Sequence, residues 1–394
     1  MRLSMKFKRL LFVHDGPIYK CGDEYYGVHY DNKLIKRYLQ LAESVTFLMR
    51  VSHISYDDIG KYMKISNTAF NVIEVSDFKS IKKYSSVWYA KKVIEKSINE
   101  CDALVIRLPS AIGVLSLRYA YKLGKPVLCE MVACVYDALW NYSWLGKALA
   151  HFKLLSYKKI VRSLPYVIYV TSEFLQKRYP TNGKELSCSD VELSSVDMSV
   201  LNKRLSEIRS KNSSDVITLG TVGGLDVIYK GQGDVIKALR LLKDKGIIVN
   251  YLLVGGGDKT QLEGLISRYN LCEQIKIIGS LSHEEVFEYF ANIDIYIQPS
   301  KQEGLPRAVI EAMSMACPVL GSKTGGIPEL IDESMLFNAG SIEKIAELIT
   351  SFNKTMMIDQ ATKNHNTSLL YQKSILDQKR AEFYDVFLSS SINK

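Results

Sequence analysis

The sequence lacks the features of a membrane-spanning chain and of a disulfide-stabilised one. No run of residues approaches the roughly 18 consecutive apolar residues that a transmembrane helix needs. The seven cysteines include no C-x-x-C pair, and Cys129 and Cys134, the closest two, are five positions apart. A dispersed, odd set of cysteines is typical of free thiols in a reducing compartment rather than of a disulfide framework or a zinc site. We therefore expect a cytoplasmic protein with ordinary apolar cores.

Two motifs of metal and cofactor binding are also missing. No Asp-x-Asp motif follows an expected strand, so we expect no metal ion at the functional site. Gly255, Gly256 and Gly257 follow a strand-like run, but the third glycine of a G-x-G-x-x-G fingerprint would fall at Thr260. The glycine cluster is therefore weak evidence for a dinucleotide, and we expect no cofactor beyond a co-substrate.

Positive charge is concentrated in the first half of the chain. The net charge of the 394 residues is +9, but residues 1–190 carry 29 Lys and Arg against 17 Asp and Glu, a net charge of +12. The remaining residues carry a net charge of −3. An anionic partner is therefore expected at the N-terminal half, and we expect no nucleic-acid partner.

Short apolar runs alternate with helical patterns twice along the chain. The expected strands cover residues 10–13, 102–106, 127–129 and 166–170, and then 216–222, 249–254 and 275–278. A polar, serine-rich stretch separates the two sets. This alternation is typical of doubly wound α/β domains. We predict an N-terminal domain at 1–190, a linker at 191–214, a C-terminal domain at 215–366, and a final helical segment at 367–394.

The most informative stretch runs from residue 298 to residue 330. It reads as a polar loop after a strand, then a helix, a short strand and a glycine turn. Glu303 falls on the loop, and Glu311, eight positions later, falls inside the helix. At about 1.5 Å rise per residue, two such carboxylates can address one elongated ligand at several points. The helix start adds free N–H groups and a positive dipole end, which favour phosphate. The pattern therefore indicates a receptor for a nucleotide sugar, although Arg307 and Glu311 could also form a helical ion pair.

This stretch resembles the signature of the retaining glycosyltransferases of family 4, which have the GT-B fold. The matching residues are E-G-L-P-x4-E-A-M from Glu303, then P-V at 318–319 and G-G-I-P-E at 325–329. The resemblance implies two Rossmann-like domains with a cleft between them and a C-terminal helix that crosses back onto the first domain. It implies that Glu303 contacts the donor sugar near the reaction centre, that Glu311 binds the ribose hydroxyls, and that Lys230 binds the phosphates. The other implied donor-binding positions are Gly223, Gly224, Gly256, Gly304, Leu305 and Pro306.

The sequence departs from the family pattern at one phosphate-binding position. Many relatives have an arginine six positions before the lysine, where this chain has Gly224. The missing cation could be supplied by one of four other residues, Lys301, Arg307, Lys323 or Arg107.

A second departure lies in the N-terminal half. Several relatives have a histidine at the end of the strand that is expected at 127–129, and this chain has Glu130 there. Either Glu130 acts catalytically at the sugar, or it forms a cap or ion pair at the strand end and His14 or Asp15 acts instead. The candidates for an acceptor or phosphate contact in this half are His14, Asp15, Gly16 and Arg107, and for Arg107 a surface salt bridge is the alternative.

The resemblance implies an enzyme that transfers a hexose-type sugar from a nucleotide sugar, most simply a UDP-sugar, with retention of configuration and without a metal. The acceptor would be a saccharide or a lipid-linked saccharide of a surface polysaccharide. Two alternatives remain: a nucleotide-sugar epimerase, which shares the fold, and a non-catalytic GT-B subunit that binds a partner transferase. The replacement of arginine by Gly224 favours the subunit, whereas the intact Glu303 and Glu311 oppose it.

A basic and apolar helix is expected within residues 140–163. Its apolar residues can share one face, and five cations decorate it. The favoured interpretation is a surface helix whose apolar face packs inward. The alternative is that this region rests on the inner face of an anionic membrane, which would make the protein a peripheral membrane enzyme.

Overall fold

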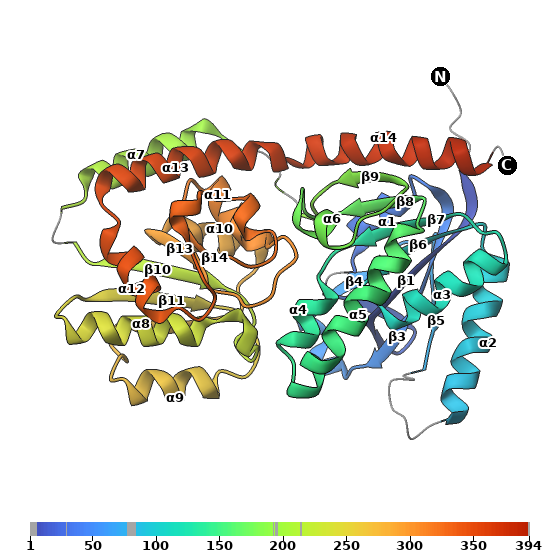
Figure 1. Cartoon of the computed structure of the whole chain (residues 1–394), viewed down its shortest axis with the longest axis horizontal. Helices are drawn as coiled ribbons and strands as arrows, with labels where there is room; N and C mark the ends of the chain where they lie inside the picture. Colours follow the sequence, from blue (N-terminus) through green and yellow to red (C-terminus); the bar gives the residue numbers. More distant parts are fainter. Residues whose placement is uncertain are drawn as a thin grey trace.

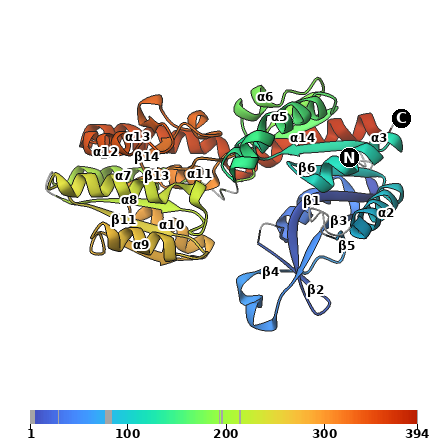
Figure 2. The same ribbon diagram turned by 60° about the horizontal axis from the view of Figure 1, so that its bottom comes forward.

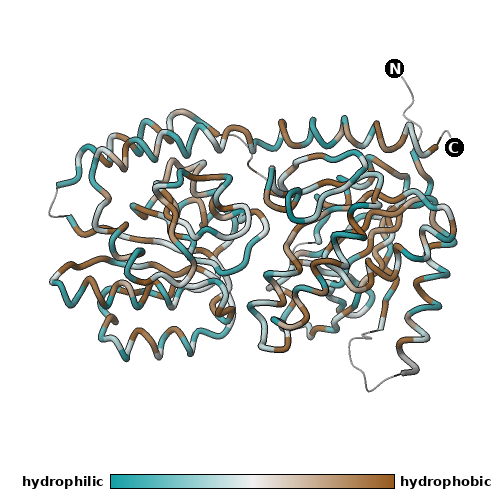
Figure 3. The backbone as a smooth tube through the Cα atoms, viewed as in Figure 1, coloured by the Kyte–Doolittle hydropathy of each residue, from teal (hydrophilic) through white to brown (hydrophobic). Residues whose placement is uncertain are grey.

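The computed structural model describes residues 6–28, 30–76, 84–191, 193, 196–212 and 215–392. Within these residues the chain forms two β-sheets, one in each half of the sequence, and helices lie on both faces of each sheet (Figure 1). Hydrophobic residues follow the central strands of both halves, as expected for sheets that are covered on two sides (Figure 3).

The N-terminal sheet has a parallel core with the strand order β5-β3-β1-β6-β7-β8-β9. These strands are β1 (Phe7–Cys21), β3 (Ala42–His53), β5 (Phe70–Glu74), β6 (Ala103–Leu108), β7 (Val127–Met131), β8 (Tyr166–Tyr169) and β9 (Lys184–Ser187). The helices of this half are α1 (Asn32–Tyr38), the 3₁₀ helix η1 (Tyr56–Lys61), α2 (Tyr84–Glu100), α3 (Ala111–Lys122), α4 (Val135–Trp140), α5 (Trp144–Arg162) and α6 (Phe174–Arg178). Parallel strands gather their carboxyl ends at one edge of the sheet, which is where ligands bind in such folds.

The first strand, expected at residues 10–13, extends well beyond that range in β1. β1 shifts its register between Val13 and Pro17 and continues to pair with β3 as far as Lys20. Its last residues pair antiparallel with β2 (Glu24–Gly27), which pairs in turn with β4 (Met63–Ile65). Figure 2 shows β2 and β4 standing away from the body of the N-terminal half. The tyrosines of this segment favour strand over loop, a preference that the scattered glycines obscured.

The C-terminal sheet is parallel and has the order β12-β11-β10-β13-β14-β15. Its strands are β10 (Ile217–Val222), β11 (Val249–Val254), β12 (Ile275–Gly279), β13 (Ile295–Gln298), β14 (Val319–Ser322) and β15 (Leu336–Phe337). The helices around it are η2 (Ile228–Lys230), α8 (Gln232–Asp244), α9 (Thr260–Arg268), α10 (His283–Ala291), α11 (Arg307–Ser314), η3 (Ile327–Glu329), η4 (Glu333–Met335) and α12 (Ile342–Ser351). A capping box of Ser282 and Glu285 opens α10.

The segment expected as a linker, residues 191–214, contains the helix α7 (Met198–Ser210), which the sequence analysis did not predict. Leu201 and Ile208 of α7 are buried, and so is Arg204. The Arg204 guanidinium donates to the carbonyls of Phe290 and Ile293 at 2.6 and 2.8 Å, around the end of α10. A cation is favourable at a helix C-terminus. The helix α7 has few apolar residues, and polar residues separate them, so the sequence pattern did not reveal the helix.

The end of the chain crosses back to the N-terminal half, as predicted. It comprises α13 (Lys354–Ser368), η5 (Leu369–Tyr371) and α14 (Lys373–Ile392). Figure 1 shows α14 lying along the N-terminal half. The Phe387 ring centroid lies 5.9 Å from that of Phe7 and 5.3 Å from that of Tyr166. Arg380 Nη2 also donates to the carbonyl of Ser189 at 2.9 Å.

The helix α5 turns its large apolar side chains outward, so the favoured prediction of inward packing was wrong. Four of these side chains have exposed fractions between 51% and 68%, namely Leu145, Leu149, Phe152 and Leu155. The residues of α5 that are buried are Gly146, Ala150, Tyr157 and Val161. The helix therefore packs on the domain through the opposite face, which carries both small and large residues.

Candidate active site

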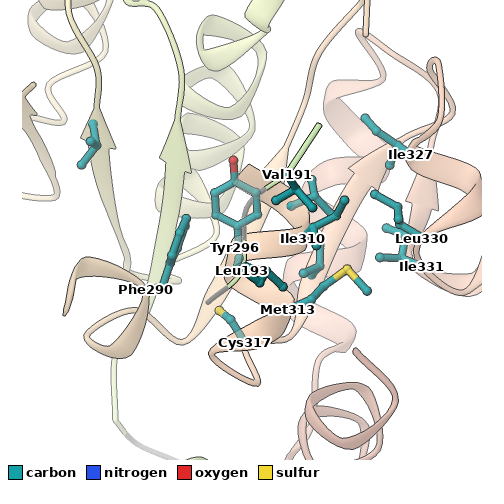
Figure 4. Close-up of a cluster of buried hydrophobic side chains, with 14 of the residues drawn as sticks. Val191, Leu193, Phe290, Tyr296, Ile310, Met313, Cys317, Ile327, Leu330 and Ile331 are labelled. Carbon is teal, nitrogen blue, oxygen red and sulfur yellow. The ribbon is translucent and has the colours of Figure 1, made fainter. Parts of the chain in front are cut away.

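The two predicted carboxylates lie at the carboxyl end of β13. Glu303 is in the loop between β13 and α11, and Glu311 is in the second turn of α11. Figure 4 shows Tyr296 of β13 beside Ile310 and Met313 of α11, in one buried cluster. This packing fixes α11 against the sheet. The two glutamates are therefore carried by well-supported elements, as a binding site requires.

Glu303 is held by an ion pair with Lys230. Glu303 Oε1 lies 2.7 Å from Lys230 Nζ, and the two side chains are 10% and 23% exposed. Gln298 Nε2 donates to the same oxygen at 3.1 Å and to Ser300 Oγ at 2.8 Å. Within the described residues, no hydrogen bond reaches the second oxygen, Oε2. The site thus presents a fixed cation beside a carboxylate that still has acceptor capacity.

The glycine turns after β10 and β11 lie against each other and beside Lys230. A Cβ on Gly223 would sit 3.5 Å from Cδ of Lys230, so the lysine side chain passes close over this turn. Gly255 has a φ of +157°, and a Cβ there would lie 1.9 Å from the Gly223 carbonyl oxygen. A Cβ on Gly256 would lie 2.9 Å from Ser280 Oγ. Close packing against backbone and side-chain atoms accounts for these glycines without a dinucleotide.

Glu311 is a partly buried carboxylate. Burial raises its pKa above the usual value, while the charges of Arg307 and His283 lower it. Glu311 and Arg307 form no salt bridge in the described part of the chain, although they are spaced i, i+4 on α11. No described residue donates a hydrogen bond to the Glu311 side chain. Such a carboxylate is suited to accept hydrogen bonds from ligand hydroxyls, because it lacks protein donors of its own.

The residues proposed to replace the missing phosphate-binding arginine are mostly engaged elsewhere. Lys301 Nζ lies 2.9 Å from Asp234 Oδ2, Lys323 pairs with Glu333, and Arg107 pairs with two carboxylates. The positive charge of Arg307 acts on Glu311 and lowers the pKa of that carboxyl. Gly224 itself accepts a hydrogen bond at its carbonyl from Gln232 Nε2 at 3.0 Å. Lys230 is therefore the cation nearest to Glu303 in the described structure.

Glu130 and Arg107 bind each other in the N-terminal half. Glu130 Oε2 accepts from Arg107 Nε and Nη2 at 2.9 and 2.7 Å and from the Tyr38 hydroxyl at 2.9 Å. Arg107 Nη2 also lies 3.2 Å from Asp190. Burial alone would raise the pKa of Asp190, but the charges of Arg107, Arg37 and Arg380 lower it to about 2. The structure thus favours the ion-pair interpretation of both Glu130 and Arg107, and a catalytic role for Glu130 stays a prediction.

His14, Asp15 and Gly16 form a second group at the carboxyl end of the N-terminal sheet. The Asp15 carboxylate accepts from Ser110 Oγ at 2.9 Å and from the N–H groups of Ala111 and Ile112 at 2.8 Å, so it caps α3. Other contacts fix the neighbouring residues: His14 Nδ1 is 2.6 Å from the Tyr30 hydroxyl, and a Cβ on Gly16 would lie 2.4 Å from that hydroxyl. These contacts are structural, and an acceptor or phosphate role for the three residues stays a prediction.

The loop that carries Glu303 touches the N-terminal half. A Cβ on Gly304 would lie 2.2 Å from the Val132 carbonyl oxygen, so this position has room only for glycine. Leu305 packs against both buried clusters, one of which is confined to the N-terminal half while the other includes residues of both halves. Pro306 occupies the N-cap position of α11. The G-L-P part of the motif therefore shapes the junction between the halves as well as the helix start.

Two residues of this region were missed by the sequence reasoning. Gln298 supports Glu303, and its position as a polar residue ending an apolar strand could have revealed it. Glu329, in η3, accepts hydrogen bonds from the N–H groups of Ser172 and Glu173 at 2.6 and 3.1 Å, and from that of Phe174. It thereby caps α6 from the other half of the chain, a long-range contact for which the sequence carries no local signal.

Comparison with known proteins identifies the family. A family model described as glycosyl transferases group 1 matches residues 206–365. The chain is 30% identical to Protein CapJ of Staphylococcus aureus over 410 residues, which cover 98% of this chain and 99% of CapJ. This chain belongs to the group 1 glycosyl transferases. Lys230, Glu303 and Glu311 of this group 1 glycosyltransferase all fall within the residues that the family model matches.

Two further comparisons concern relatives and fold. The amylovoran biosynthesis glycosyltransferase AmsK of Erwinia amylovora is 37% identical over 113 residues, 27% of this chain and 28% of AmsK. The solved structure of Anabaena HepE in complex with UDP is similar with a TM-score of 0.64 and 17% identity, over 95% of this chain and 98% of HepE. The group 1 glycosyltransferase therefore has the predicted GT-B fold, with two Rossmann-like units and a C-terminal helix that returns to the first.

The described residues of this glycosyltransferase include neither a cluster of metal-ligating side chains nor a membrane-spanning helix. They contain no group of three or more His, Cys, Asp or Glu side chains that is arranged to hold a metal ion. None of their helices combines the length and apolarity that crossing a bilayer requires. All seven cysteines are free thiols.

Proposed function

We propose that this glycosyltransferase moves a hexose-type sugar from a UDP-sugar to a saccharide or lipid-linked saccharide acceptor, with retention of configuration. The observation that carries the proposal is the ion pair between Lys230 and Glu303, 2.7 Å apart at the carboxyl ends of β10 and β13. The pair places a cation beside a carboxylate that can accept hydrogen bonds from hydroxyl groups. A sugar diphosphate has hydroxyls next to anionic phosphates and matches this arrangement.

Each of three residues has a separate task in this proposal. Lys230 binds the pyrophosphate and stabilises the charge that grows on the leaving group as the glycosidic bond breaks. Glu303 accepts hydrogen bonds from hydroxyls of the transferred sugar and orients it. Glu311, one turn into α11, accepts hydrogen bonds from the ribose. The N–H groups at the start of α11 add a positive dipole end near the phosphates.

The proposed reaction is a front-face displacement. The bond between the anomeric carbon and the phosphate oxygen breaks, and a bond to the acceptor oxygen forms on the same face of the sugar. The acceptor proton moves to the leaving phosphate oxygen, so the products are the glycoside and UDP. We also propose that the chain belongs to family 4, because residues 303–329 resemble the signature of that family. We also propose that transfer needs no metal ion, because Lys230 supplies a cation where the leaving charge develops.

Two of the similar proteins support the proposed donor and pathway. HepE has been solved with UDP and also with UDP and glucose. AmsK is described as a biosynthesis glycosyltransferase for amylovoran. On these grounds we propose UDP as the nucleotide and surface polysaccharide synthesis as the setting.

The experiment that tests the proposal is a panel of nucleotide sugars, ranked by thermal shift and then assayed for product with lipid-linked saccharide acceptors in the presence of a chelator. We expect an acceptor-dependent product whose anomeric configuration, read by NMR, equals that of the donor. A product of inverted configuration would contradict the mechanism. Conversion of the donor without any acceptor would support the epimerase instead.

A non-catalytic partner subunit is the second candidate, because Gly224 replaces a cation of the family pattern. A subunit of that kind would bind UDP weakly and would release none from a UDP-sugar. Measurable release of UDP by the purified wild-type chain with an acceptor, abolished by Glu303→Ala, excludes this candidate.

A further inference from the structure

Asn141 reaches from the N-terminal half to the loop that carries Glu303. It is the C-cap residue of α4, and its Nδ2 donates to the carbonyl of Asp137 at 3.0 Å and to the carbonyl of Lys301 at 2.9 Å. A side-chain amide has two N–H hydrogens, so one can stay at the helix end while the other reaches across. Figure 1 shows α4 on the side of the N-terminal half that faces the C-terminal half. The second hydrogen bond therefore joins the two halves beside the candidate active site.

Lys301 is hydrogen-bonded through its backbone on both sides. Its N–H group donates to the carbonyl of Tyr229 at 2.7 Å, and its carbonyl accepts from Asn141. Tyr229 immediately precedes Lys230 in the chain, and Glu303 comes two positions after the bonded carbonyl. The backbone of Lys301 therefore connects three segments: the end of α4, the segment that carries the candidate phosphate ligand, and the loop that carries the candidate sugar ligand.

The helix α4 is itself held in place, so Asn141 projects from a fixed support. Asp137 Oδ1 forms an ion pair with Arg178 Nη1 of α6 at 2.7 Å. The N–H group of Tyr136, at the start of α4, donates to the hydroxyl of Tyr179 at 3.2 Å. A side chain can position a neighbouring loop only if its own support does not move. The contacts of α4 with α6 meet that requirement.

We propose that Asn141 is a positioning residue for sugar transfer. By donating to the Lys301 carbonyl, Asn141 fixes the loop after β13, so that the Glu303 carboxylate meets the transferred sugar at the correct distance from Lys230. The inference rests on the role that the proposed function gives to Glu303. It gives the N-terminal half a part in arranging the donor site, although Asn141 itself does not touch the donor.

The hydrogen bond of Asn141 should affect the rate more than the affinity for the nucleotide. A misplacement of about 1 Å in the groups that orient a substrate can lower a rate about a hundredfold. A loop released from Asn141 shifts the Glu303 carboxylate relative to the sugar. Lys230 and Glu311, by contrast, are carried by η2 and α11 of the C-terminal half. The nucleotide therefore keeps its ligands when the bond is lost.

The first test compares Asn141→Ala with the wild type of the full chain. We expect kcat to fall about tenfold or more, while the calorimetric Kd for UDP stays within about twofold of the wild-type value. A kcat equal to that of the wild type would overturn the proposal. A Kd for UDP that rises as much as kcat falls would also overturn it, because Asn141 would then support the nucleotide site and not the orientation of the sugar.

Asn292→Ala is the matched control. Asn292 is the C-cap residue of α10, and its Nδ2 donates to the carbonyl four positions earlier, that of Glu288, at 2.8 Å. Asn141 makes the same bond within its own helix. In the described part of the chain Asn292 forms no hydrogen bond with the N-terminal half, so its variant should keep the wild-type kcat. Equal losses of kcat in the two variants would reduce the role of Asn141 to that of a helix cap.

Two further substitutions test whether the donated hydrogen bond is responsible. Asn141→Asp keeps the shape of the side chain but has no N–H group, and its charged carboxylate repels the Lys301 carbonyl. Asn141→Gln keeps the amide on a longer side chain. We expect Asn141→Asp to be as slow as Asn141→Ala or slower, and Asn141→Gln to recover part of the lost kcat. Equal values of kcat in the Asp and Gln variants would overturn the proposal.

Hydrogen–deuterium exchange of the full chain detects the position of the loop without any assay of activity. The amides of residues 299–305, among them the Lys301 N–H group, should exchange faster in Asn141→Ala than in the wild type and in Asn292→Ala. Unchanged exchange would overturn the role of Asn141, whatever the activity of the chain. Faster exchange in Asn141→Ala, together with a wild type that transfers no sugar, would overturn the proposed function alone.

Discussion

Lys230 and Glu303 are 73 positions apart in the sequence and meet at 2.7 Å between Nζ and Oε1. Each comes from a loop at the carboxyl end of a different parallel strand. In the absence of a ligand, the positive charge of Lys230 and the negative charge of Glu303 neutralise each other. A bound sugar diphosphate would offer phosphate oxygens to the lysine and hydroxyls to the carboxylate, so both charges gain partners when the donor binds.

The carboxylate of Glu311 should favour donor binding but lower the stability of the folded protein at pH 7. Burial raises its pKa above that of the unfolded chain, so folding costs more when the carboxyl is charged than when it is protonated, and the stability associated with this proton is present at low pH and lost as pH rises through the folded-state pKa. Glu311→Gln should therefore raise the melting temperature at pH 7. It should also raise KM for the donor about tenfold or more, with little change in kcat, because the ribose is bound equally before and during reaction.

The same raised pKa predicts the pH dependence of donor binding. As the pH is lowered, the affinity of the wild type for UDP should begin to fall at a higher pH than it would if Glu311 were an exposed glutamate. This pH dependence should be absent in Glu311→Gln. Calorimetric titrations with UDP between pH 5 and 8 provide the measurement. A wild-type profile identical to that of the variant would exclude Glu311 from the nucleotide site.

Gly224→Arg should strengthen donor binding if the pyrophosphate site lacks a cation. A Cβ at this position would lie 3.0 Å from Val227 Cγ2 and 3.4 Å from Asp226 Oδ1, so small side-chain shifts accommodate it. A charge-assisted hydrogen bond to phosphate should tighten UDP binding by about tenfold. Gly224→Gln adds similar bulk without charge and serves as the control. Equal affinities of the two variants would show that no cation is missing.

Glu130→Gln should affect stability more than turnover. The change removes the charge partner that is closest to the buried Arg107 guanidinium, and breaking a buried ion pair costs about 3–5 kcal/mol. We expect a clearly lower melting temperature and, at a temperature where the variant is folded, a kcat close to that of the wild type. The opposite result, normal stability with kcat reduced about a hundredfold, would restore the catalytic role that the sequence first indicated.

Glu329→Gln tests the contact between the two halves. Its carboxylate caps α6 through the N–H groups of Ser172, Glu173 and Phe174, and loss of a cap costs about 1 kcal/mol. We expect a lower melting temperature and lower turnover, because the Glu303 loop rests on the same junction. Glu333→Gln, at an exposed surface pair with Lys323, should change neither quantity. Indistinguishable behaviour of the two variants would contradict the role of Glu329.

The sequence predicted the features that depend on neighbouring residues, and it missed side-chain contacts between distant segments. The positions of Glu303 on a loop and Glu311 in a helix follow from about thirty consecutive residues, and the crossover of α14 followed from the resemblance. The partners of Glu130 and Glu329 could not be predicted, because they come from segments that only the fold brings together. The outward direction of the apolar side chains of α5 was also not determined by the sequence pattern, since an apolar stripe on a helix does not show which side of the helix packs on the domain.

Calorimetry of UDP with wild type and Lys230→Met tests the central claim that the pair of Lys230 and Glu303 marks the donor site. Circular dichroism would first establish that the variant is folded. Lys344→Met removes an exposed lysine of the same half, on α12, and is the matched control. We predict that the Kd for UDP rises at least about tenfold in Lys230→Met and stays unchanged in Lys344→Met. An unchanged Kd in Lys230→Met would contradict the account, because the pyrophosphate would then bind elsewhere.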